Sequence, residues 1–129
     1  MRTLLAALLL AAAPKPPVIH ESFTPLPCPK HPVSTVDQEA CQEKVILATD
    51  RTIDARAKAI FELLIPSARR SFVAGEQAWL RYRRLSCDAD SSKFAGGTLA
   101  GVEFAGCVIA RNKTHAQDLA GTLAVLRSH

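Results

Sequence analysis

Four cysteines in a chain of 129 residues constrain this sequence more than any other feature. They occupy positions 28, 41, 87 and 107, which divides them into an N-terminal and a C-terminal pair. A domain too small to bury a large core commonly adds disulfides, provided that it folds in an oxidising compartment. What the cysteines do therefore depends on whether the chain is exported.

The N-terminus predicts export. Arg2 is followed by an apolar run from Leu4 to Ala13 that ends in small residues. One basic residue and about ten apolar ones are typical of a secretory signal peptide, whereas a membrane span needs about 20. We therefore expect residues 1–13 to be a signal peptide rather than a transmembrane anchor, and the mature protein to be periplasmic or secreted. Removal of Arg2 lowers the net charge from +4 to +3.

Residues 14–33 hold seven of the eight prolines. Because proline fixes φ and has no backbone N–H to donate, this segment predicts an extended leader rather than a helix or a central strand. Residues 34–129 are then the expected folded domain, too short for a Rossmann or TIM-barrel enzyme. Its core must be aliphatic, because 48% of the chain is hydrophobic but only 5% is aromatic.

A helix of about 30 residues is predicted after the leader, ending near Leu64 and Ile65. Ser34 begins it as an N-cap, with Gln38 or Glu39 as the partner in a capping box. Isoleucines recur every seven residues, as expected for one buried helix face, at Ile46, Ile53 and Ile60.

Two further helices are predicted. Pro66 suits the first turn of the second, and apolar positions continue at helical spacing through Ser86. Residues 88–106 are rich in serine and glycine and predict a loop. The third helix is expected to begin near Cys107. The expected fold is therefore all-α, a disulfide-stapled helical hairpin with a third helix packed on it.

Export predicts that the cysteines pair as disulfides. We favour Cys28–Cys41 with Cys87–Cys107, because each bond closes a short segment and contributes about 3 kcal/mol. The competing arrangement joins Cys41 to Cys87, which lie almost equally far from the turn at residues 64–66, and leaves Cys28 for Cys107.

A metal site is the other use of cysteines. Cys28-Pro-Lys-His31 resembles half of a zinc clip, but Cys87 and Cys107 have no close second ligand to complete it. The histidines are scattered and lack partners at ligand spacing. We therefore expect no metal and no other cofactor.

Asp50 falls within the apolar seam of the first helix, where a free carboxylate is costly. On the second helix Glu76, Trp79 and Arg83 share one stripe. We therefore expect a semi-buried structural cluster of Asp50, Glu76 and Arg83, with the Trp79 indole beside it. Two carboxylates near a tryptophan also resemble a glycosidase site, but a small three-helix domain offers little concavity. We expect no catalytic residues.

The stretch from Glu76 to Cys87 carries a recognisable pattern: an acidic or amide residue, Ala-Trp, an aromatic residue, an arginine, and a cysteine eight residues after the tryptophan. Gly96-Gly97-Thr98-Leu99-Ala100, Cys107 and a predicted helix follow. With all four cysteines in order, residues 28–126 resemble the LprI-like lysozyme-inhibitor family of exported bacterial proteins. The resemblance implies a small helical envelope protein that is not an enzyme, with lysozyme inhibition attributed to the family's namesake.

The chain departs from this pattern at three positions. Glu76 stands where glutamine is usual, Arg84 where an acidic residue commonly follows the arginine, and His115 where an arginine is usual. Arg84 makes the surface more basic, and a mature chain at +3 would be repelled by the basic lysozymes of animals.

Two surfaces are candidates for binding a partner. The predicted loop is suited to a lysozyme or related muramidase, because its acids can reach a basic groove; the residues are Asp88, Asp90, Gly96, Gly97 and Glu103. The second helix presents a basic face suited to an anionic envelope partner, formed by Arg69, Arg70, Arg81 and Arg84. Nucleic acid is not an expected partner, because export removes the chain from the cytoplasm.

Overall fold

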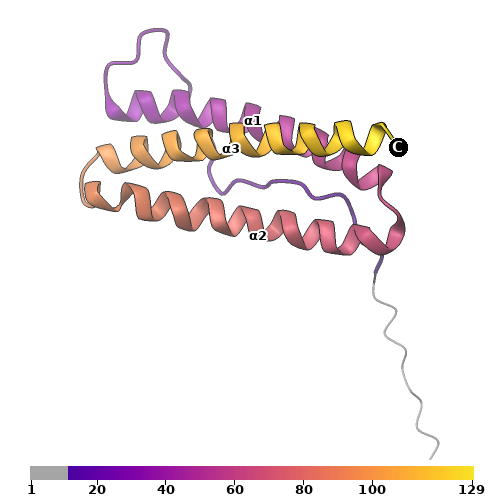
Figure 1. The fold of residues 1–129 in the computed structure, drawn as a ribbon. Helices are drawn as coiled ribbons and strands as arrows, with labels where there is room; N and C mark the ends of the chain where they lie inside the picture. The colour runs from indigo at the N-terminus through magenta and orange to yellow at the C-terminus, as the bar shows by residue number, and fades with distance from the viewer. Residues whose placement is uncertain (1–11) are drawn as a thin grey trace, which may run out of the picture.

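The structure, a computed structural model, describes residues 12–129. It contains three long helices, α1 (Thr35–Leu63), α2 (Pro66–Ser91) and α3 (Leu99–Arg127), and one turn of 3-10 helix, η1 (Ser92–Phe94). The helices lie side by side (Figure 1), and residues 12–129 contain no β-strand. The predicted all-α fold is therefore confirmed. Most of the expected signal peptide lies outside the described residues.

Ser34 caps α1 as predicted, but its partner in the capping box is Asp37 and not Gln38 or Glu39. The Asp37 backbone N–H donates to Ser34 Oγ at 3.1 Å, and the Ser34 backbone N–H donates to Asp37 Oδ2 at 3.3 Å. Aspartate fills this role because it occupies the third helical position after the cap.

The end of α1 next to Leu64 also agrees with the prediction. Pro66 occupies the first turn of α2 and keeps Ile65 in an extended conformation. Arg69 then closes the end of α1, donating from Nε to the carbonyls of Phe61 at 3.0 Å and Leu64 at 3.2 Å. Its guanidinium lies 4.8 Å from the centroid of the Phe61 ring.

Residues 88–106 are largely helical, so the predicted loop is too long. α2 continues through Ser91 and α3 begins at Leu99, which leaves only residues 92–98 to connect them. The third helix therefore starts a full two turns before Cys107, where the sequence had placed its beginning.

The glycines that suggested a loop serve two different purposes. Gly96 has a φ of 84°, and it turns the chain between the helices. Gly101 instead lies inside α3 where that helix passes close to α1, since a Cβ there would fall 2.7 Å from Glu39 Cδ. Gly106 faces Gln42 across the same interface. Sequence spacing does not separate a glycine that bends the chain from one that lets two helices approach.

α3 is the helix on which the other two pack. It lies along α1 for most of its length and also contacts α2. The leader runs through the space between α1 and α2 (Figure 1). The Ile19 backbone N–H donates to Asp54 Oδ1 at 2.9 Å, which holds the leader to α1. Burial raises the pKa of Asp54.

The core consists of two apolar clusters. The first joins α1 and α3 through Ile53, Ala57, Ile60, Ala116, Leu119 and Leu123, and Ile19 of the leader packs against it. The second is formed by Ile46, Cys87, Ala105 and Val108, and Phe23 of the leader packs against it. All three heptad isoleucines are therefore buried. Leader residues contribute to both clusters.

The favoured cysteine pairing is confirmed. Cys28 is bonded to Cys41, and Cys87 is bonded to Cys107. The competing arrangement is wrong, because the leader lies between α1 and α2 and the two helices do not meet as a bare hairpin. The first disulfide ties the leader to α1, and the second ties α2 to α3.

Two neighbouring leader residues test whether this segment contributes to the core. Ile19→Ala should lower the free energy of unfolding by about 1–2 kcal/mol, because Ile19 packs on the first cluster. Val18→Ala is the matched control, because Val18 is 54% exposed, and it should change stability by less than about 0.5 kcal/mol. Urea unfolding of both variants makes the comparison. If Ile19→Ala and Val18→Ala changed the free energy of unfolding equally, Ile19 of the leader would not pack on the first cluster.

Candidate functional site

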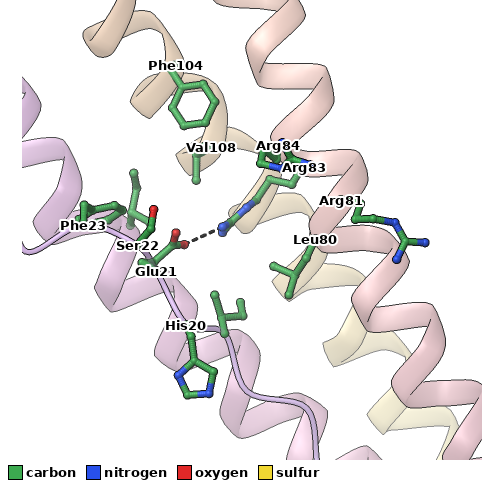
Figure 2. A pocket seen from close by; sticks show the side chains of 12 residues that line it. His20, Glu21, Ser22, Phe23, Leu80, Arg81, Arg83, Arg84, Phe104 and Val108 are labelled. Carbon is green, nitrogen blue, oxygen red and sulfur yellow. Dashed lines mark hydrogen bonds and ion pairs between the residues drawn. The ribbon is translucent and has the colours of Figure 1, made fainter.

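A buried polar layer separates the two apolar clusters. Arg83 of α2 donates from Nη1 to Asp50 Oδ1 at 3.1 Å and to Asn112 Oδ1 at 3.0 Å. From Nη2 it donates to Glu21 Oε1 of the leader at 2.6 Å (Figure 2). Asn112 is fully buried and donates from Nδ2 to Asp50 Oδ1 and to Thr49 Oγ1, each at 2.8 Å. One layer therefore links three helices and the leader.

The polar layer is not balanced in charge, because two carboxylates share one guanidinium. Burial first, and then the neighbouring Glu21 carboxyl, raise the pKa of Asp50 to about 7 against the opposing effects of Arg83 and Asn112. The layer therefore changes its charge near neutral pH.

The expected structural cluster forms two linked contacts. Asp50 and Arg83 are paired in the polar layer, whereas Glu76 Oε2 lies 2.9 Å from Nε2 of His115 on α3. The His115 ring stacks on Trp79, with 3.8 Å between centroids and 10° between planes. The Arg83 guanidinium lies 5.6 Å from the Trp79 ring centroid. Trp79 therefore lies between the two polar pairs.

Four members of these contacts were not singled out from the sequence as site residues: Glu21, Thr49, Asn112 and His115. Asn112 had a usable signal, since it stands on the apolar heptad of α3 as Asp50 does on α1. His115 had one too, because it replaces a usual arginine of the family pattern. Glu21 had none, because it lies within an irregular proline-rich segment without periodicity.

The candidate partner-binding loop residues are divided among three elements. Asp88 and Asp90 lie on the last turns of α2, Gly96 and Gly97 lie in the turn, and Glu103 lies on α3. The structure still brings Asp90 and Glu103 together, because both line a hollow of about 450 Å³ beside Cys107. Asp88 does not line that hollow.

Acidic residues of α1 lie at the same end of the bundle. Glu39 packs against Gly101, which is two residues from Glu103 on α3. Burial and the negative charge of Glu39 raise the pKa of Glu43. We call Glu39, Glu43, Asp90 and Glu103 together the acidic end. Of these four, Asp90 and Glu103 line the hollow at the α2–α3 turn, and Lys93 lines it as well.

The expected basic face on α2 keeps three of its four arginines. Arg70, Arg81 and Arg84 are exposed. Arg69 does not join them, because its guanidinium is bonded to the carbonyls at the end of α1. The basic face is accordingly defined here as Arg70, Arg81 and Arg84.

Residues 12–129 contain no group of three or more His, Cys, Asp or Glu side chains that could hold a metal ion. None of the helices in that part of the chain is long and apolar enough to cross a membrane.

The fold and its contacts define the class of protein. It is a small three-helix domain cross-linked by two disulfides, with salt bridges in a polar layer of its core. The model of one protein family, Lysozyme inhibitor LprI, matches residues 28–119, and the chain belongs to this family. No curated protein and no solved structure matches the chain. The matched region includes all four cysteines, but it begins after Glu21 and the rest of the docked leader.

Asp50→Asn tests the charge imbalance of the polar layer. In the wild type the native Asp50 carboxyl holds its proton up to about pH 7, whereas the unfolded one loses it near pH 4. The stability contributed by this group is therefore fully present below about pH 4, and it is lost as the pH rises to about 7. Asp50→Asn should remove that loss, so its stability relative to the wild type should rise between about pH 4 and about pH 7 and then level off.

Urea unfolding across this range measures the effect, with Asp118→Asn as the control for loss of an exposed carboxylate on α3. The control should follow the wild-type profile. Parallel profiles for the wild type and Asp50→Asn would contradict the raised pKa.

Proposed function

We propose that this protein is an exported, non-enzymatic binding protein that inhibits a lysozyme or a related muramidase. The family match over residues 28–119 is the observation that carries the proposal. The expected signal peptide at residues 1–13 would deliver the leader (14–33) and the helical domain (34–129) to the periplasm or the exterior, where such enzymes act.

The contacts of the buried carboxylates support binding rather than catalysis. Asp50 accepts hydrogen bonds from Arg83 and Asn112, and Glu76 is paired with His115. A general acid or base must be within reach of a substrate proton, whereas these groups are directed at partners from other helices. Their arrangement favours a role in holding the bundle together.

The acidic end is the surface we propose for contact with a basic enzyme. The charge of +3 expected for the mature chain opposes association with a basic lysozyme, but charges are screened beyond about 10 Å at 0.1 M salt. Contact is therefore governed by local charge. At the acidic end Asp90 and Glu103 share a hollow with Lys93, and Asp90 lies 3.7 Å from Arg111 Nη2. Glu103 forms no salt bridge with any residue of 12–129. Carboxylates there complement a basic groove.

The second disulfide makes this surface rigid. Cys107 lines the hollow itself, and its bond to Cys87 fixes α3 against α2 at that point. A surface held in its binding geometry loses less conformational entropy on association, which improves affinity.

Inhibition should depend on the charge of the acidic end. The oxidised protein, titrated into cell-wall lysis by a basic lysozyme, should inhibit at micromolar concentration or below. Glu103→Lys should raise the half-inhibitory concentration about tenfold or more, because it opposes the enzyme's positive charge. An acidic lysozyme should be inhibited less.

Asp118→Lys is the matched control, because it makes the same charge change at an exposed site on α3, far from the hollow. It should inhibit as the wild type does. A wild-type protein without inhibitory activity toward either lysozyme would refute the proposed function.

An anionic envelope partner is a second candidate. The basic face supports it, because Arg70, Arg81 and Arg84 are exposed and form no salt bridge with any residue of 12–129. Three arginines on one helix face attract anionic lipid headgroups or cell-wall polymers.

Binding to vesicles of anionic phospholipid tests this second candidate. Affinity should fall steeply as salt is raised, and Arg81→Glu should weaken binding severalfold. Arg127→Glu changes the same charge at the end of α3 and should have a smaller effect. Binding that does not respond to salt would exclude the electrostatic mechanism.

A further inference from the structure

A cavity of about 320 Å³ opens between the leader and α2 (Figure 2). This volume falls at the lower end of the range for small-molecule sites. The leader and all three long helices contribute to its lining. The cavity is separate from the hollow at the acidic end.

The inner wall of this cavity is apolar. Ile46 and Val108 belong to the second cluster, and Phe23 and Phe104 pack against the same cluster from its edge. Leu80 adds a further aliphatic side chain. A guest that displaces water from such a wall gains from the hydrophobic effect in proportion to its apolar area. A sugar would leave its hydroxyls without partners there, so the wall favours a hydrocarbon chain.

The polar part of the lining consists of three arginines of α2 and of His20, Glu21 and Ser22 of the leader, and the Glu21 carboxylate is paired with Arg83. Arg81 and Arg84 are exposed and have no carboxylate partner among the described residues. Arg83 has a side chain only 8% exposed, and its Nε–H is buried without an acceptor. Its two terminal nitrogens are already bonded to Glu21, Asp50 and Asn112. The cavity thus offers free cationic donors beside an apolar wall.

We infer that this cavity binds a single-chain amphiphile with an anionic head group. The acyl chain lies against Ile46, Phe104 and Val108, and the head group contacts Arg84 where the cavity opens to solvent. A free fatty acid and a lysophospholipid share this chemistry. The inference is independent of the muramidase proposal, since the acidic end takes no part in it.

Calorimetric titration of the full mature protein with decanoate, below its critical micelle concentration, tests the inference. We expect a dissociation constant on the order of 100 μM. Dodecanoate should bind about tenfold more tightly, because each added methylene contributes a factor of about three to four. Decanol, which has the chain without the charge, should bind about tenfold more weakly than decanoate.

Matched variants separate the head-group contact from general charge effects. Arg84→Glu should weaken decanoate binding about tenfold, whereas Arg70→Glu, on the same helix but outside the lining, should leave it within about twofold. Ser22→Trp should abolish binding by filling the cavity from the exposed leader, and Ser22→Ala should not. Glu103→Lys should bind decanoate as the wild type does, even where it no longer inhibits lysozyme.

The source of the amphiphile follows from a second titration, with dodecanoyl lysophosphatidylglycerol. Tighter binding than dodecanoate supports a membrane-derived ligand, and binding of the fatty acids alone supports a free one. No saturable binding by either would overturn the inference. Equal affinity for decanol and decanoate, or equal effects of Arg84→Glu and Arg70→Glu, would overturn it as well.

Discussion

The bonds of Arg83 determine how the rest of the molecule is arranged. A planar guanidinium presents five donors in a fixed fork, so one side chain can bond to several segments at once. Here it holds Asp50 of α1, Asn112 of α3 and Glu21 of the leader between two apolar clusters. Sliding one helix past another by a turn would leave buried charges unpaired, which is strongly destabilising. The register of all four segments therefore depends on this one group.

Features set by local spacing could be predicted from the sequence, and those set by packing could not. The heptad isoleucines predicted the buried face of α1, and the expected export together with the short spacing of the cysteines predicted both disulfides. The predicted loop at residues 88–106 is too long, because Gly101 and Gly106 lie where α3 packs closely against α1 and do not reverse the chain. Glu21 was missed because no periodicity in a proline-rich segment indicates which side chain meets an arginine 62 residues away. Within the candidate site, Asp90 of α2 and Glu103 of α3 are neighbours because the two helices pack together, and sequence spacing does not predict that contact.

Net charge proved a poor guide to what this protein can contact. The net charge of the chain is +4, yet carboxylates lie close together at the α2–α3 turn and exposed arginines lie along α2. Screening by salt limits the electrostatic attraction of each surface to groups within about 10 Å of it at 0.1 M salt. One small bundle therefore offers two surfaces of opposite sign, which is what the proposed contacts with a basic enzyme and with an anionic ligand require.

Both disulfides lie toward the same end of the bundle. Cys28–Cys41 joins the leader to the first turns of α1, and Cys87–Cys107 joins the last turns of α2 to the first half of α3. The opposite end, with the α1–α2 connection and the C-terminus of α3, has no covalent cross-link among the described residues. A cross-link limits how far two segments can separate when a protein opens locally, so the disulfides restrict such opening most at the linked end. The surface where the acids gather lies at that end, and its shape is therefore held by covalent bonds as well as by packing.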